Sequence, residues 1–199
     1  MNVLFLTNSI VSTTLIGWLS ERENVTKLER PVTIDDILAI RPDLVISYSY
    51  RHIIKAAVLD ALPDKFINLH ISLLPFNRGA DPNTWSFLDD TPKGVSIHLI
   101  DQGIDTGPIL YQREVVFDEE KDTLNSTYAA LQHEIQNLFI THWDAIKNAR
   151  IMPVPQTLPG TYHCSKDLAK LKDALINEDG WDVTIRQLKK RYQSLSERS

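Results

Sequence analysis

The alternation of short apolar runs with helical patterns in the first half of the chain constrains its fold more than any other feature. Residues 3–6, 25–28 and 44–47 form short runs rich in apolar residues, and residues 13–20 and 34–40 between them have helical character. Strands that are apolar on both faces are typical of parallel sheets, and each parallel connection needs a crossover that is usually a helix. We therefore predict an α/β fold with a mainly parallel, Rossmann-like sheet and helices on both of its faces.

A longer helical pattern follows the predicted strands. Apolar residues recur with helical spacing from Leu124 to Ile146, and Asp122 or Thr123 is placed to cap the first turn. We predict that this helix packs on the sheet and does not line a ligand site. The chain changes character after residue 150, where spaced prolines predict an extended arm that leads into a helix over residues 166–176.

Length and charge indicate a small globular domain that does not bind nucleic acid. A chain of 199 residues buries roughly 70% of its unfolded surface, which is enough for an independent core. The formal net charge is -5, whereas nucleic-acid binders usually present a basic face. The densest basic run, from Lys189 to Arg191, is more typical of a solvated helix face.

The protein is predicted to be cytoplasmic and not bound to a membrane. Its single cysteine, Cys164, excludes an internal disulfide framework and fits a reducing compartment. The apolar opening from Met1 to Leu19 lacks the basic start of a signal peptide and is interrupted by polar residues, so it indicates a strand, a turn and a helix. No run approaches the roughly 20 apolar residues that a membrane-spanning helix requires.

Three polar residues follow short apolar runs at positions where a catalytic site needs them. Asn68 and His70 occur where the strand that begins at Phe66 should end, and the period of two in a strand places them on one face. Residues 95–100 form a further predicted strand, and the turn-prone segment after it carries Asp105. Ligands of an open parallel sheet lie beyond the carboxyl ends of its strands, and all three residues fall there.

These residues belong to a series of short motifs that resembles a known family. The chain contains Asn-x-His, Ser-Leu-Leu-Pro, Arg-Gly, Gly-x-Ser-Ile-His and Asp-x-Gly-x-Asp-Thr-Gly, in that order, between residues 68 and 107. Together they look like the catalytic core of the formyltransferases that use N10-formyltetrahydrofolate. The resemblance runs from about residue 42 to about residue 150. It implies a formyltransferase catalytic domain over residues 1–150, with a C-terminal arm and helices over residues 151–199 packed on it.

By this resemblance Asn68, His70 and Asp105, here called the catalytic trio, carry the chemistry. An amine that attacks a formyl carbon creates an oxyanion, which a neutral donor such as the Asn68 amide stabilises. His70 would move protons as a general acid and base, since an imidazole titrates near neutral pH. Asp105 would hold His70 in one protonation pattern and favour its cationic form, or would order a water that relays the proton.

The resemblance also implies which residues hold the two substrates. The cosubstrate N10-formyltetrahydrofolate is expected between two segments, whose binding residues would be His52, Ile53, Ile54, Asp101, Gln102, Gly103 and Ile104. Taken alone, Ile53 and Ile54 would more often be core residues. Arg78 and Gly79 are expected at the substrate, where the guanidinium of Arg78 would hold an anion or, equally, pair with a carboxylate. The histidines show no metal-ligand spacing, so no metal is expected.

The predicted acceptor is a nucleotide-linked amino sugar, because residues 48–52 and 78–85 look most like the enzymes that formylate such sugars. Phosphoribosylglycinamide formyltransferase is the alternative, but the purine-pathway members bind a phosphate on a glycine-rich loop, and residues 6–10 contain no glycine. The tRNA formyltransferases resemble the core but add a C-terminal domain, for which the residues after Arg150 are too few. A non-catalytic module that binds folate or nucleotide is a further alternative, although it has no need of the catalytic trio.

Three more expectations concern the shape of the molecule. Few residues precede Asn68, so the N-terminal half is expected to lack part of the usual series of βα units, with one crossover lost. Leu74–Pro75 is a candidate cis peptide bond, since a turn here would re-aim the chain beside the site. A homodimer is possible.

Overall fold

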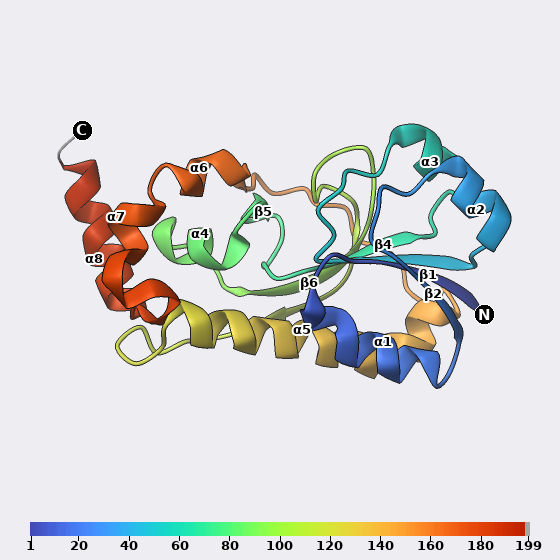
Figure 1. Ribbon diagram of the computed structural model, residues 1–199, viewed down its shortest axis with the longest axis horizontal. Coiled ribbons are helices and arrows are strands. Elements are labelled where there is room, and N and C mark those ends of the chain that lie inside the picture. Colours follow the sequence, from blue (N-terminus) through green and yellow to red (C-terminus); the bar gives the residue numbers. More distant parts are fainter. Residues whose placement is uncertain (198–199) are drawn as a thin grey trace.

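A six-stranded sheet forms the centre of the computed structural model, which describes residues 1–197 (Figure 1). Its strand order is β2-β1-β3-β4-β6-β7. The strands are β1 (Asn2–Leu6), β2 (Asn24–Leu28), β3 (Leu44–Tyr48), β4 (Phe66–His70), β6 (Gly94–Leu99) and β7 (Ile109–Glu114). The pairs β2–β1, β1–β3 and β3–β4 are parallel, whereas the pairs β4–β6 and β6–β7 are antiparallel. The prediction of an α/β fold with a mainly parallel sheet is therefore confirmed.

Helices cover both faces of this sheet, as predicted (Figure 1). α1 (Thr13–Ser20) and the long α5 (Leu124–Lys147) cover one face, and α2 (Ile34–Ile40) and α3 (Ala56–Asp60) cover the other. Successive side chains of β1 pack into the cores on opposite faces of the sheet, because side chains alternate along a strand. The core beneath α1 and α5 includes Val3, Phe5, Leu15, Ile135 and Phe139. The core beneath α2 and α3 includes Leu4, Leu6, Ile37, Val58 and Leu59.

Every crossover between β1 and β4 is present. α1, α2 and α3 connect the four successive strands, so the expectation that one crossover is lost is wrong. The units are compact because these helices contain only 8, 7 and 5 residues. α2 begins with a capping box between Thr33 and Asp36, which satisfies backbone donors that so short a helix would otherwise leave unpaired.

The C-terminal residues form a helical cluster at one end of the molecule (Figure 1). It comprises α6 (Ser165–Ala169), α7 (Lys172–Ile176), the 3-10 helix η2 (Asn177–Asp182) and α8 (Ile185–Ser196). The single helix predicted over residues 166–176 is wrong in extent, because two short helices form there and Lys170 and Leu171 separate them. The cluster packs on α4 (Pro82–Leu88) and the start of α5 through an apolar core that includes Trp85, Phe87, Leu124, Leu175 and Leu188.

An extended arm connects α5 to this cluster. Val154 in the arm pairs with Ile109 at the edge of the main sheet. Further on, β8 (Tyr162–His163) pairs with β5 (Arg78–Gly79) to form a separate two-stranded sheet. The arm predicted from the prolines therefore lies against the Arg-Gly motif, although these segments are far apart in the sequence.

The basic run near the C-terminus lies on a helix, α8, as predicted, but only Lys190 is an exposed residue of the predicted solvated face. Lys189 Nζ lies 3.0 Å from carboxylate oxygens of Asp90 and Glu119, and Arg191 pairs with Asp179. These ion pairs hold α8 against neighbouring segments. No helix within residues 1–197 combines the length and apolar character needed to cross a membrane.

Candidate active site

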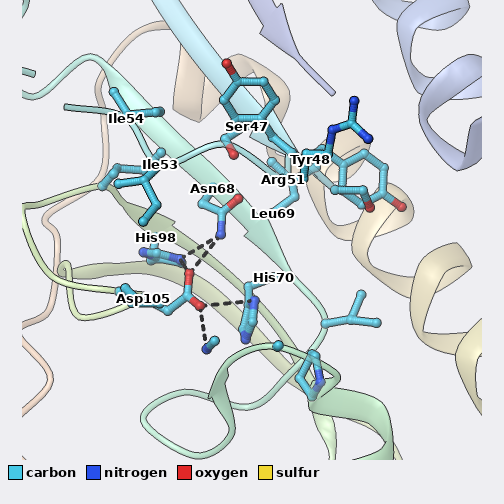
Figure 2. Close-up of a pocket in the computed structure, with 18 of the residues that line it drawn as sticks. Ser47, Tyr48, Arg51, Ile53, Ile54, Asn68, Leu69, His70, His98 and Asp105 are labelled. Carbon is cyan, nitrogen blue, oxygen red and sulfur yellow. Dashed lines mark hydrogen bonds and ion pairs between the residues drawn. The ribbon is translucent and has the colours of Figure 1, made fainter. Parts of the chain in front are cut away.

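The catalytic trio meets at the carboxyl end of β4 (Figure 2). Asn68 and His70 project from the same face of this strand, and Asp105 comes from the loop between β6 and β7. Asn68 Nδ2 donates a hydrogen bond to Asp105 Oδ1 at 3.0 Å. His70 Nδ1 lies 3.6 Å from Asp105 Oδ2, which is longer than a direct hydrogen bond, so the two groups attract through charge when the ring is protonated.

A fourth side chain, His98 of β6, completes the cluster. The antiparallel register places His98 opposite Asn68, and His98 Nε2 lies 3.3 Å from both Asn68 Nδ2 and Asp105 Oδ1. His98 Nδ1 donates to the Leu99 carbonyl oxygen at 2.7 Å. A neutral His98 then has a bare Nε2 that accepts from Asn68, whereas a protonated His98 donates to Asp105. The sequence prediction missed His98, although the Gly-x-Ser-Ile-His motif contains it, because its role depends on which strand lies beside β4.

The ring of His70 is held by the loop that follows β4. Its Nε2 lies 3.1 Å from the carbonyl oxygen of Asn77, a residue with left-handed backbone at φ 55°. Because a carbonyl only accepts, Nε2 carries a hydrogen, and Nδ1 is the nitrogen that faces Asp105. The Leu74–Pro75 bond in the same loop is cis, as predicted.

Asp105 is a largely buried carboxylate between two imidazoles, with 12% of its side chain exposed. Burial raises the pKa of the Asp105 carboxyl, but the charges of His70 and His98 and the hydrogen bonds from His98 and the Gly79 N–H outweigh this effect. The pKa of Asp105 is therefore well below its ordinary value. Asp105 thus stays ionised at neutral pH. Among residues 1–197, no group of three or more His, Cys, Asp or Glu side chains is arranged to hold a metal ion.

A cavity of about 840 Å³ opens over these residues, within the range of roughly 300–1,000 Å³ that is usual for small-molecule sites. The loop after β3 and the loop after β6 both line it. All of the predicted cofactor-binding residues are among the lining residues: His52, Ile53, Ile54, Asp101, Gln102, Gly103 and Ile104. The side chain of Ile53 is 81% exposed and is not part of the core, whereas Ile54 packs partly against the core beneath α2 and α3.

The loop after β3 is held in place by the two neighbouring loops of the sheet. Asn8, in the loop after β1, accepts a hydrogen bond from the Arg51 backbone N–H at 3.1 Å. The Tyr50 hydroxyl donates to the Arg30 carbonyl oxygen at 2.6 Å and accepts from the Val32 N–H at 3.0 Å. The glycine-free loop after β1 therefore supports a cavity wall through a side chain.

The two predicted substrate residues have different positions. Gly79 lines the cavity, and its N–H donates to Asp105 Oδ2 at 2.9 Å. Arg78 is not a lining residue; its Nε donates to the Thr161 carbonyl oxygen at 3.4 Å. Adjacent residues of a strand point in opposite directions, so the pairing of β5 with β8 directs Gly79 and Arg78 to different sides. The expectation that Arg78 faces the substrate therefore differs from its observed position.

Other parts of the site come from α5 and the arm, which the sequence prediction did not include. Tyr128 and Gln132 of α5 line the cavity, so the prediction that this helix does not line a ligand site is wrong. Residues four apart lie on the same side of a helix, and here that side faces the end of β4. In the arm, Gln156 Nε2 donates to the carbonyl oxygens of Asp105 and Gly107 at 2.9 and 2.8 Å.

The chain is similar to a solved formyltransferase over nearly its whole length. The formyltransferase PseJ from Anoxybacillus kamchatkensis, in complex with UDP-4,6-dideoxy-4-formamido-L-AltNAc and tetrahydrofolate, is 41% identical. The match covers 96% of this chain and 99% of that chain with a TM-score of 0.87.

Curated relatives match with lower coverage of their own length. The methionyl-tRNA formyltransferase of Pelobacter propionicus is 32% identical over 166 residues, which are 82% of this chain and 50% of the relative. The dTDP-4-amino-4,6-dideoxyglucose formyltransferase of Mycobacterium bovis is 34% identical over 140 residues, 70% of this chain and 58% of the relative. The chain thus spans about half the length of the curated relatives that it matches.

A family model described as formyl transferase matches residues 16–142. These residues include the catalytic trio, His98 and both loops that line the cavity. Because the match covers more than half of the chain, the protein belongs to the formyl transferase family.

Proposed function

We propose that the protein transfers a formyl group from N10-formyltetrahydrofolate to the amino group of a nucleotide-linked amino sugar. The observation that carries this proposal is the 41% identity over 99% of PseJ, whose structure contains a UDP-linked formamido sugar and tetrahydrofolate. The buried cluster of Asn68, His70 and Asp105 at the cavity supports turnover over binding alone. A module that only binds folate or nucleotide does not need an imidazole between an ionised carboxylate and a backbone carbonyl.

His70 is the proposed general acid and base. Its Nε2 is occupied by the Asn77 carbonyl, so Nδ1 is the nitrogen that gains and loses a proton. Asp105, whose oxygen lies 3.6 Å from Nδ1, stabilises the charged ring and keeps its orientation. In this proposal the proton leaves the attacking amine through His70 and is returned to the departing folate nitrogen.

Asn68 is the proposed donor to the oxyanion. One hydrogen of its amide is donated to Asp105 at 3.0 Å, and the other reaches His98 Nε2 at 3.3 Å when that ring is neutral. The proposed role requires the formyl oxygen to replace His98, the longer of the two contacts. Protonation of His98 would release that hydrogen, because a charged His98 donates from Nε2 and no longer accepts there.

The cavity fits the folate cosubstrate. N10-formyltetrahydrofolate supplies an activated formyl group when it is bound. Its reduced pterin has a planar pyrimidine half with a polar edge. This group suits a cavity of about 840 Å³ with the apolar side chains of Ile53, Ile54 and Ile104 and the polar side chains of Asp101, Gln102 and Asp105 along its walls. These loops would bind the ring and place the formyl carbon beside Asn68.

Glycinamide ribonucleotide and methionyl-tRNA are the competing acceptors. The loop after β1 lacks glycine, and its Asn8 side chain already holds the loop after β3, which disfavours a phosphate cradle there. The relation to the Pelobacter propionicus methionyl-tRNA formyltransferase favours methionyl-tRNA, although it covers only 50% of that relative.

The decisive experiment measures the release of tetrahydrofolate with each of three acceptors: a UDP-linked 4-amino sugar, glycinamide ribonucleotide and methionyl-tRNA. We expect turnover with the amino sugar and none with the others, and a kcat about 10²-fold lower or more in the His70→Ala variant. Turnover with one of the other acceptors alone would contradict the proposed acceptor. Folate binding without turnover of any acceptor would support the non-catalytic alternative.

Two further predictions concern the protein in the cell and in solution. We expect a cytoplasmic enzyme, which fractionation with a tagged chain would test. The chain could also form a homodimer, and sedimentation equilibrium would distinguish a homodimer from a monomer by its mass.

A further inference from the structure

A second cavity of about 360 Å³ adjoins the candidate active site. Both cavities are lined by Ile71, Asp81, Pro82 and Tyr128, so these residues form a junction. Beyond the junction, the second cavity is lined by Asn83, Thr84, Leu124, Asn125 and Trp181. The far wall thus comes from α4, the start of α5 and η2, which belong to the C-terminal helical cluster and its neighbours.

The junction sets the direction in which an acceptor can extend. The loops proposed to bind folate line only the first cavity, since Ile53, Ile54 and residues 101–105 are absent from the lining of the second. An amine beside His70 therefore has folate on one side. The rest of a long acceptor can then extend past the junction, toward Trp181.

Aromatic rings at the second cavity suit a flat, uncharged group. Trp181 is 45% exposed and Tyr128 is 39% exposed, although both are large aromatic side chains. Exposed aromatic rings within a cavity are typical platforms for nucleobases, because every base presents a π-face. The floor provided by Leu124 is apolar and buried.

A positive charge lies beside this cavity. Lys172 Nζ lies 5.4 Å from the centroid of the Trp181 ring. The same ammonium acts on Asp81 at the junction: burial raises the pKa of the Asp81 carboxyl, and the charge of Lys172 opposes that rise. Within residues 1–197 no carboxylate forms an ion pair with Lys172 at 4.0 Å or less. Its ammonium is therefore available to an anionic ligand between Asp81 and Trp181.

We propose that the second cavity binds the nucleotide end of the acceptor, with a pyrimidine base against Trp181 and Tyr128 and the diphosphate beside Lys172. This inference rests on the proposed function, because it assigns a site to part of that acceptor. The sugar occupies the junction, where Asp81 accepts hydrogen bonds from its hydroxyl or amide groups. Lys172, and not Arg78, supplies the cation, since Arg78 faces the arm.

Binding of UDP and of uridine to the folded chain, measured by titration calorimetry, tests this site without any need for turnover. Lys172→Ala should weaken UDP binding about tenfold or more and leave uridine binding nearly unchanged, because only UDP carries the anion. Trp181→Ala should weaken both ligands, and Trp181→Phe should weaken them less. Lys190→Ala, which removes an exposed lysine of α8, is the matched control and should change neither.

Kinetics separate this proposal from the proposed function. With an active enzyme, Lys172→Ala should raise the KM for the nucleotide sugar about tenfold, with little change in kcat or in the KM for folate. Turnover by the wild type with unchanged KM in both the Lys172 and Trp181 variants would overturn the subsite and leave the function standing. UDP binding that depends on both residues, in a chain without formyl transfer, would overturn the function and support the subsite. Absence of UDP binding to the wild type would overturn the subsite.

Discussion

At the scale of single residues, the site is organised around one ionised carboxylate. Asp105 contacts Asn68, His70, His98 and the Gly79 N–H, and each contact favours its charged form. The burial that would otherwise neutralise Asp105 instead strengthens its interactions with both imidazoles, because a low dielectric screens charge weakly. One carboxylate therefore contacts both imidazoles, the Asn68 amide and a backbone N–H.

Removal of either proposed catalytic group should affect turnover far more than folding. We expect Asn68→Ala and His70→Ala each to lower kcat by about 10²-fold or more, since an oxyanion donor and a general base act on the transition state. The measurement is kcat with the amino sugar, alongside a circular dichroism melt. Near-normal kcat, or loss of the folded state in both variants, would contradict the assignment.

Replacement of Asp105 by asparagine should change the dependence of stability on pH. The pKa of Asp105 is lowered in the folded state, so its stabilising contribution is present above the unfolded value of about 3.9 and is lost as the pH falls through the folded value. We expect Asp105→Asn to lower the free energy of unfolding by about 1–3 kcal/mol at pH 7. The difference from the wild type should shrink below about pH 4. Urea unfolding at pH 7 and pH 2.5 provides the measurement, and a variant that is more stable than the wild type at pH 7 would refute it.

At the scale of elements, the short pairing of β5 with β8 connects the arm to the site. Gly79 has φ +89°, and a Cβ atom there would lie 2.3 Å from the His163 carbonyl oxygen. Only glycine therefore allows β8 to approach while the Gly79 N–H still reaches Asp105. The ring of His163 stacks on Trp85 at 3.8 Å, and its Nε2 lies 2.6 Å from Asp89, so the arm is anchored at the same point.

Gly79→Ala should therefore impair both stability and turnover. We expect a loss of about 1–3 kcal/mol from the strained backbone, and more from the clash, together with a fall in kcat because Asp105 loses a donor. Gly180→Ala is the control for backbone strain, since Gly180 has φ +58° and a Cβ atom there meets nothing within 4 Å. Gly17→Ala, in an open position of α1, is the control for activity. Equal effects of Gly79→Ala and Gly180→Ala on stability would show that the contact with β8 is unimportant.

At the scale of the whole molecule, the C-terminal cluster is part of the packed core. Leu168, Leu175, Val183 and Leu188 are buried against Trp85 and the start of α5. The same long helix α5 also covers the sheet with Ile135 and Phe139. The boundary near residue 150 between a catalytic domain and a C-terminal extension stays a prediction from the sequence. We propose that the residues on the two sides of this boundary fold together as one cooperative unit.

Unfolding in urea should then be a single transition. One variant retaining only Trp143, in the core of the sheet, and another retaining only Trp85, in the C-terminal core, report the two regions separately. We expect coincident midpoints of tryptophan fluorescence, equal to the midpoint from circular dichroism for each variant. Separate midpoints within one variant would mean that the C-terminal cluster unfolds independently.

The sequence by itself determined the elements and the main residues of the candidate site. Strands β1, β2, β3, β4 and β6 and helices α1, α2 and α5 follow from patterns within short segments, whereas β5, β7 and β8 were not predicted. The period of two is enough to place Asn68 and His70 on one face. The family resemblance at residues 52–54 and the Asp-x-Gly-x-Asp-Thr-Gly motif identified both loops of the cavity. These features are local, so each is recorded within a few neighbouring residues.

Only the tertiary structure decided which distant residues join that site. His98 enters because β6 pairs with β4 in one register, and Tyr128 enters because α5 continues past the end of the sheet. Gln156 reaches the Asp105 carbonyl from the arm, and Arg78 turns away because β8 pairs with β5. The contacts of His98 with Asn68, of Gln156 with Asp105 and of Arg78 with Thr161 each join residues at least 30 positions apart in the sequence. They depend on the packing of all the elements between those residues. No pattern within a single segment contains that information.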